Sequence, residues 1–286
     1  MSSYLRIGVA SVPADGGELL SDRLWSLGAL GIHEAVDAEG TLVLTTAFDD
    51  DVVVADVATA LRAHAWVAWV AEVDDDGSWW DAWRAHHDAV WVGGDRLVVA
   101  PAWLPPPATG PTTVVVTVEP GRTFGSGAHA TTRLVLELML DHRQHFVGAR
   151  VLDVGCGSGV LAVVAARLGA AEVVAVDIDP AAVATTVANA DANGVGAVVT
   201  AGLVDDHRVT GIFDIVLANV LPSVLDEWAP RLTSLSGHTI AVSGFLVGDE
   251  HRACHHFPDR TLVVSVAIDG WGASWLAINR ELAKPD

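Results

Sequence analysis

Residues 1–73 alternate short apolar runs with polar turns in a pattern that predicts a small α+β domain. Runs rich in β-branched and aromatic side chains, typical of strands, occupy residues 4–9, 32–36, 41–46 and 66–73. Residues 17–27 and a segment that ends near residue 63 favour helices, the second one capped by Asp50 or Asp51. The resulting order, βαββαβ, is that of a ferredoxin-like fold. We expect this domain to recognise a substrate, because it carries no obvious catalytic group.

Two breaks in the hydrophobic pattern bound a connector over residues 74–111. The first break is the acidic turn that begins at Asp74, and the second is the proline-rich stretch of residues 105–111, which is expected to be semi-rigid. Between them, Trp79 and Trp83 are one helical turn apart and so share a face of a short predicted helix. We interpret them as packing residues and not as a substrate cage.

Residues 112–286 have the pattern of a parallel α/β domain. Residues 151–154 are apolar and lead into a glycine turn, residues 161–168 carry apolar positions at helical spacing, and residues 173–177 form the next strand. Further strands are predicted at residues 113–118, 214–218 and 238–243, helices at 133–140 and 245–254, and a β-hairpin from 261–268 and 273–280. We therefore expect an α/β fold with seven strands that ends in an antiparallel hairpin.

The glycine turn carries the first candidate chemistry. Gly155, Gly157 and Gly159 lack side chains where a ligand must lie against the backbone. Asp177 ends the following strand, where an acidic residue accepts hydrogen bonds from ribose hydroxyls in dinucleotide folds. The spacing is AspxGlyxGlyxGly from Asp153 and not GxGxxG, so we expect an adenosine derivative other than a nicotinamide dinucleotide. The pattern resembles the class I (Rossmann-like) S-adenosylmethionine-dependent methyltransferases.

Composition and charge narrow the function classes. The chain has 286 residues, of which 51% are hydrophobic and 18% charged, enough for two buried cores. Two cysteines cannot form a disulfide framework, and the sequence has neither a signal-peptide pattern nor about 18 uninterrupted apolar residues. We expect a cytoplasmic protein without membrane contact. The formal net charge of −20 argues against direct nucleic-acid binding and favours a basic partner.

A second dense motif, Phe124-Gly-Ser-Gly-Ala-His-Ala-Thr-Thr132, precedes the helix of residues 133–140. Phe124 and Gly125 put an aromatic side chain on a flexible loop, which is able to close over a ligand as a lid. Thr131 and Thr132 are alternative caps for the helix. We expect His129 to orient the loop, with general-base catalysis as the alternative. The adjacent histidine pairs diverge on a helix or a strand, so no metal site is predicted.

This motif is similar to the FGTGxHxTT signature of PrmA, a family that methylates the eleventh protein of the large ribosomal subunit. Further similar segments are Trp79-Trp-Asp-Ala-Trp-Arg84, the Glu119-Pro-Gly turn, Asp177-Ile-Asp-Pro180, residues 189–194 and residues 214–221. The chain departs from the family pattern at Ser126, at Ala130 and in residues 270–275. The resemblance implies that Thr132, Gly155, Asp177 and Asn219 contact S-adenosylmethionine. The full expected set of cofactor contacts is Phe124, Gly125, Thr131, Thr132, Asp153, Gly155, Gly157, Gly159, Asp177, Ile178 and Asn219.

Asn219 is the expected catalytic residue, because it follows the strand of residues 214–218 at the edge where doubly wound folds bind ligands. Its side-chain oxygen can accept a hydrogen bond from an amine. Methyl transfer needs a neutral amine, whereas lysine has a pKa of about 10.4. Desolvation under the Phe124 loop lowers that pKa and nearby carboxylates raise it. Asp153 and Asp179 are therefore expected to be structural or adenosine-end residues and not bases.

The resemblance implies an S-adenosylmethionine-dependent protein N-methyltransferase, acting on lysine side-chain and N-terminal amines of the ribosomal protein. We expect it to be a monomer. One alternative is a small-molecule N- or O-methyltransferase on the same scaffold. The other is a cofactor-binding protein without turnover, against which the retained Asn219 and paired threonines argue.

Overall fold

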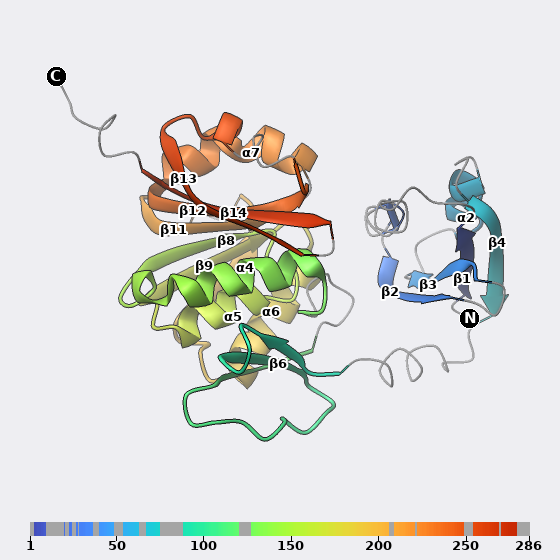
Figure 1. Cartoon of the computed structure of the whole chain (residues 1–286), viewed down its shortest axis with the longest axis horizontal. Coiled ribbons are helices and arrows are strands. Elements are labelled where there is room, and N and C mark those ends of the chain that lie inside the picture. Colours follow the sequence, from blue (N-terminus) through green and yellow to red (C-terminus); the bar gives the residue numbers. More distant parts are fainter. Residues whose placement is uncertain are drawn as a thin grey trace. The chain divides into compact units, whose positions relative to one another are not determined.

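The chain forms two compact units that divide between residues 88 and 89 (Figure 1). The computed structural model describes residues 3–9, 20, 23–24, 27, 29–36, 40–48, 54–62, 67–74, 88–119, 127–205, 209–220, 222–248, 254–268 and 270–278. Within these ranges, no helix is both long enough and apolar enough to span a bilayer.

The N-terminal unit contains an antiparallel sheet, in which the described strands follow the order β2-β3-β1-β4. The strands are β1 (Ser3–Val9), β2 (Ala29–Val36), β3 (Leu42–Phe48) and β4 (Val67–Asp74), and the helix α2 (Val54–Arg62) precedes β4. Leu5, Ile7 and Val9 alternate along β1 and are buried with Leu61 of α2. The four predicted strands are thus confirmed. The predicted helix of residues 17–27 lies largely outside the described residues.

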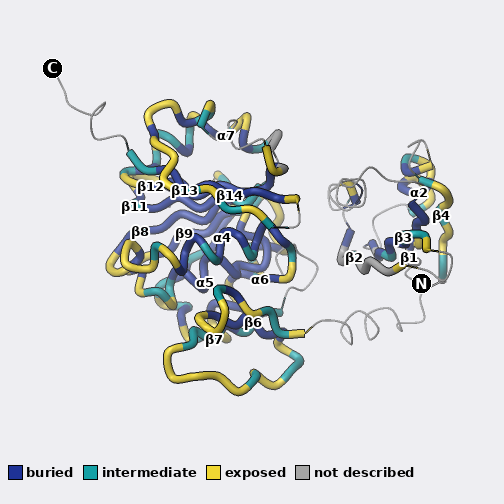
Figure 2. Tube along the Cα trace, viewed as in Figure 1, coloured by how far each residue is buried: buried dark blue, intermediate teal, exposed yellow. Residues whose placement is uncertain are grey.

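The C-terminal unit is built on a mixed sheet with the order β10-β9-β8-β11-β12-β14-β13 among the described strands. Its parallel strands are β8 (Arg150–Val154), β9 (Glu172–Asp177), β10 (Val199–Leu203), β11 (Phe213–Asn219) and β12 (Ser236–Leu246). The hairpin of β13 (Arg260–Ile268) and β14 (Trp271–Ile278) adds two antiparallel strands to the sheet. Strand β14 pairs with β12, and β13 pairs with β14. The interior strands are buried along nearly their whole length (Figure 2), as expected for a sheet covered on both faces.

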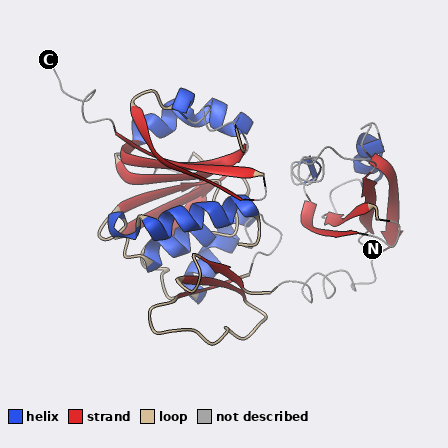
Figure 3. Ribbon diagram, viewed as in Figure 1, coloured by secondary structure: helices blue, strands red, loops and turns tan. Residues whose placement is uncertain are grey.

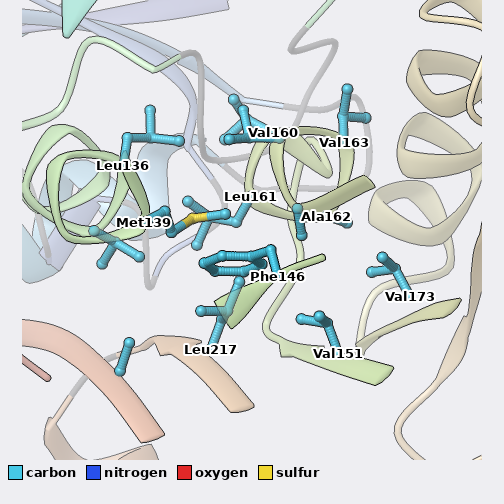
Figure 4. Packing of buried hydrophobic residues seen from close by; sticks show 14 of the residues in the cluster. Leu136, Met139, Phe146, Val151, Val160, Leu161, Ala162, Val163, Val173 and Leu217 are labelled. Atoms are coloured by element: carbon cyan, nitrogen blue, oxygen red, sulfur yellow. The ribbon is translucent and has the colours of Figure 1, made fainter. Parts of the chain in front are cut away.

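Alternate residues of the central strands pack into two separate hydrophobic cores. Val151 and Leu217 pack with α4 (Ala130–Asp141) and α5 (Val160–Arg167), while Leu152 and Val216 pack with α7 (Pro222–Leu235). Helix α6 (Pro180–Ala192) joins the first group through Ala190, so α4 to α6 cover one face and α7 the other (Figure 3). In the first core, the ring of Phe146 lies among Met139, Leu161 and Leu217 (Figure 4).

A small three-stranded sheet lies within the C-terminal unit. Strand β6 (Leu97–Pro101) pairs antiparallel with β5 (Val90–Val92) and parallel with β7 (Val114–Val118). Strands β5 and β6 fall in the stretch predicted as a connector, yet β6 is buried throughout and pairs with β7. Residues 89–111 of this stretch are therefore part of the C-terminal unit.

The helix predicted at residues 245–254 is wrong over its first residues. Phe245 and Leu246 continue β12, and a turn at Val247 and Gly248 follows. The physical reason is pairing with β14, where Phe245 opposes Gly272, because a tertiary partner outweighs weak local helical spacing.

Candidate functional site

The predicted site residues on the glycine turn, at Asp177 and at Asn219 lie at one edge of the main sheet. The glycine turn follows β8, Asp177 ends β9, and Asn219 ends β11. These strands are neighbours in the order β9-β8-β11, and they run parallel. Their carboxyl ends therefore meet, at the edge where open α/β sheets bind ligands.

The glycine turn has a backbone that other residues would strain. Gly155, Gly157 and Gly159 have φ angles of 71°, 53° and 79°, in the left-handed region that favours glycine. A Cβ atom added to Gly159 would lie 2.7 Å from the Thr186 Cγ2 and 2.9 Å from the Thr186 Cα on α6. A Cβ atom added to Gly155 would lie 2.7 Å from the Val220 Cγ1. The turn is thus packed tightly against α6 and β11, and it leaves bare backbone at the sheet edge.

Asp177 holds the turn and its own loop. Its Oδ2 accepts a hydrogen bond from the Gly157 N–H at 2.9 Å, and its Oδ1 accepts one from the Asp179 N–H at 3.1 Å. An ionised carboxylate has about four acceptor sites, so capacity for ribose hydroxyls remains. The next side chain, Ile178, is 80% exposed. An apolar side chain this exposed, beside a carboxylate with remaining acceptor capacity, offers a surface on which an aromatic ring can pack.

Asp153 is a fully buried carboxyl group beneath the turn. Its Oδ2 accepts a hydrogen bond from the Ala162 N–H in the first turn of α5 at 3.1 Å. No described group bonds its Oδ1, which is also buried. The pKa of Asp153 is raised to about 7, chiefly by burial and to a smaller extent by the charge of Asp177, while the Ala162 bond opposes the shift. A buried acceptor without a partner is rare, and it matches a site whose ligand supplies a donor.

The raised pKa makes stability depend on pH. The folded-state pKa of about 7 exceeds the ordinary 3.8, so the folded protein binds the Asp153 proton more tightly than the unfolded chain does. The stability that this proton contributes is therefore lost as the pH rises toward 7. Between pH 5.5 and 8, the free energy of unfolding should fall by about 2 kcal/mol more in the wild type than in Asp153→Asn. Urea unfolding at both pH values measures the difference, and equal pH slopes would contradict the assignment.

Helix α4 begins earlier than predicted, and its cap is His129. The His129 Nδ1 accepts from the Thr131 N–H at 3.3 Å and lies 2.8 Å from the Thr131 hydroxyl. Thr131 and Thr132 are buried inside the first turn, so the suggestion that a threonine caps the helix is wrong. Burial lowers the pKa of His129 to about 4, and its ring meets the edge of Trp271 at a centroid distance of 5.5 Å.

This geometry separates the two roles considered for His129. His129→Ala should lower the free energy of unfolding by at least about 1 kcal/mol through loss of the cap. His129→Asn keeps a capping oxygen and should restore most of that stability together with full methylation activity. A general base is worth about 10²-fold or more in rate, so a loss of that size in a stable His129→Asn protein would favour the base role.

Asn219 and Thr132 are brought together although they are far apart in sequence. The Asn219 Nδ2 donates to the Thr132 Oγ1 at 3.3 Å. Thr132 is 1% exposed, whereas Asn219 is only partly buried. The amide is therefore held at one end by α4, and its oxygen is left to meet a ligand at the sheet edge.

A small pocket adjoins Asn219. It is lined by Val220, Leu225, Asp226, Ser243, Gly244, Phe245 and His256. Ser243 is the ladder partner of Asn219 across β11 and β12, and the His256 Nε2 contacts the Asp226 Oδ1 at 2.8 Å. Sequence reasoning considered His256 only as a metal ligand beside His255. The described residues contain no group of three or more His, Cys, Asp or Glu side chains suited to a metal ion.

The site also contains residues that the sequence reasoning gave no role. The Thr186 Oγ1 donates to the Gly157 carbonyl at 3.1 Å, and the Asn189 Nδ2 donates to the Ser158 carbonyl at 2.8 Å. The sequence feature that could have identified them is their polar side chains on the inner face of a helix that is otherwise rich in alanine and valine. Phe124 and Gly125, predicted as a lid, lie outside the described residues.

Comparison with known proteins shows which family this chain is similar to. The family described as "Ribosomal protein L11 methyltransferase (PrmA)" matches residues 21–280. A protein of that name from Burkholderia thailandensis is 37% identical over 265 residues, covering 83% of this chain and 86% of the relative. Another from Ralstonia pickettii is 34% identical over 291 residues, covering 92% and 95%. A crystal structure of ribosomal protein L11 methylase from Lactobacillus delbrueckii subsp. bulgaricus is 24% identical and has a TM-score of 0.60, covering 67% of this chain and 99% of that one; this likeness concerns the fold.

Proposed function

The chain belongs to the ribosomal protein L11 methyltransferase (PrmA) family, and from that premise we propose that it methylates amines of ribosomal protein L11. The methyl donor is S-adenosylmethionine. Lysine side-chain amines and N-terminal amines are the acceptors that the chemistry of the site suits. The observation that carries the proposal is the Asn219 amide, held by Thr132 at the sheet edge beside the glycine turn.

The residues present fit the cofactor. When bound, S-adenosylmethionine supplies an electrophilic methyl group on a sulfonium sulfur. The turn of Gly155, Gly157 and Gly159 offers backbone where added Cβ atoms at two positions would collide with neighbours. Asp177 has acceptor capacity for the ribose, and the exposed Ile178 suits the adenine ring. The unpartnered oxygen of Asp153 suits a donor on the ligand.

The chain's own groups then align a neutral amine. The Asn219 oxygen accepts one N–H of the amine, while Thr132 keeps the amide from rotating. A neutral acceptor orients the amine without raising the pKa of the amine, whereas a carboxylate would raise it. Correct alignment of two reactants supplies much of the rate enhancement in such a displacement. Burial raises the pKa of the Cys156 thiol, so we assign it no nucleophilic role.

We also propose a role for the N-terminal unit. Its strand order 2-3-1-4, with α2 before β4, supports a ferredoxin-like fold over residues 1–73, ahead of a seven-stranded class I methyltransferase unit. Residues 1–73 contain eleven acidic and three basic side chains. Such a surface attracts a basic protein over a distance comparable to the Debye length. We assign substrate docking to this unit, in a monomeric cytoplasmic enzyme.

Mass spectrometry of purified L11 after incubation with this enzyme and S-adenosylmethionine tests the proposal. The expected result is a mass gain equal to one or more added methyl groups, absent when the cofactor is omitted. Unchanged L11, in a sample that binds S-adenosylhomocysteine by calorimetry, would reject L11 as the substrate and favour a small-molecule acceptor. Absence of both methylation and binding would reject the methyltransferase assignment itself.

A further inference from the structure

Helix α6 presents a buried polar face toward β7. Thr186, Asn189 and Asn193 follow one another at helical spacing, with Asn193 as the C-terminal cap, and Thr186 and Asn189 are 0% and 3% exposed. Strand β7 is an edge strand of its sheet. The Val118 carbonyl accepts from the Ala102 N–H, so Val118 faces β6. The backbone N–H and carbonyl groups of the residues before and after Val118 therefore point away from β6, toward the free edge of β7.

Two side-chain amides occupy that opposite side. The Asn193 Oδ1 accepts from the Thr117 N–H at 2.8 Å, and its Nδ2 donates to the Thr117 carbonyl at 2.6 Å. Asn189 repeats the pattern with Glu119, accepting from its N–H at 2.9 Å and donating to its carbonyl at 2.8 Å. The two asparagines thus satisfy the free edge of β7 as a neighbouring strand would.

The third bond of Asn193 stays within its own helix, where the Nδ2 donates to the Asn189 carbonyl at 2.7 Å, and only Asn189 reaches the glycine turn. Its Nδ2 also donates to the Ser158 carbonyl in the glycine turn at 2.8 Å. Ser158 is fully buried and lies between Gly157 and Gly159, whose φ angles are both positive. One buried amide therefore joins the glycine turn to Glu119, the residue that follows β7.

We propose that Asn189 is a positioning residue that couples the glycine turn to the backbone of Glu119 at the end of β7, and thereby sets cofactor affinity. This inference rests on the proposed function. Loss of the amide removes this hydrogen bond to the buried Ser158 carbonyl, and removing one partner of a buried hydrogen bond destabilises the conformation that contains it. The turn then relaxes away from the geometry that its glycines hold. Asn189 acts through the turn, and its role needs no contact with the substrate amine.

Asn193 is the matched control, because Asn189→Ala removes two amide bonds to the Glu119 backbone and Asn193→Ala removes two to the Thr117 backbone. Calorimetric titration of the full-length proteins with S-adenosylhomocysteine measures affinity, and urea unfolding measures stability. Both variants should lose stability. Asn189→Ala should raise the Kd by about tenfold, equivalent to about 1.4 kcal/mol, while Asn193→Ala leaves the Kd close to the wild-type value.

Equal changes in Kd for the two variants, or an unchanged Kd in Asn189→Ala, would overturn the coupling role. If Asn189→Ala does not fold, Asn189→Ser is measured against Asn193→Ser with the same expectations. A wild-type protein that fails to bind S-adenosylhomocysteine would reject the proposed function and this inference together. Wild-type binding without a difference between the variants would reject the coupling alone.

Discussion

Replacing Asn219 with alanine is expected to lower kcat/KM for L11 methylation by about 10²-fold or more, the size of effect that follows from misplacing a reacting group. The amide is the group at the end of β11 that can accept an amine N–H, and Thr132 fixes its orientation through a 3.3 Å hydrogen bond. Alanine removes the acceptor without adding charge. Steady-state kinetics with purified L11 and S-adenosylmethionine measures the loss, which should fall on kcat.

Thr132 offers a graded control for this prediction. Thr132→Ser keeps the hydroxyl that receives the Asn219 Nδ2, whereas Thr132→Val keeps the shape and removes the hydroxyl. We expect Thr132→Ser to stay close to the wild type and Thr132→Val to fall between the wild type and Asn219→Ala. Binding of S-adenosylhomocysteine should persist in Asn219→Ala. A loss of that binding in proportion to the loss of rate would instead assign Asn219 to the cofactor and remove its role toward the amine.

Sequence alone predicted those features of this protein that are determined by residues close together in the chain. The turn from β8 to α5 needs glycine at positions of positive φ, and the spacing of Gly155, Gly157 and Gly159 reports that need directly. The strands of both units follow runs of β-branched residues with clear turn signals between them. The end of β11 at Asn219 follows in the same way, from an apolar run and its position in the α/β order.

What sequence could not predict depends on partners far away in the chain. Thr132 and Asn219 form one group only because α4 packs beside β11, and no periodicity records that pairing. The cap of α4 is a histidine ring that lies against Trp271, although threonine has the stronger general capping preference. Likewise, the pKa of Asp153 is raised by its complete burial, and a carboxylate in a glycine motif carries no local signal of burial.

Asp177→Asn is expected to weaken binding of S-adenosylhomocysteine by about 10- to 100-fold, since hydrogen bonds to charged groups contribute about 1.5–3 kcal/mol. Asp177 uses both oxygens on backbone N–H groups of the turn and the following loop. An asparagine has one acceptor oxygen in place of two, so it cannot hold both backbone groups and also accept from the ribose. Calorimetry measures the affinity, and circular dichroism checks that the fold persists.

Asp179→Asn is the matched control, two residues away with the same chemical change. Asp179 caps α6 by accepting from the Ala181 N–H at 2.8 Å, and asparagine caps a helix about as well as aspartate. Its carboxylate is exposed, so neutralising it should leave affinity nearly unchanged. If both variants weaken binding equally, the effect is the general loss of negative charge at this loop. A selective loss in Asp177→Asn requires the specific acceptor geometry at the end of β9, which is what ribose recognition demands.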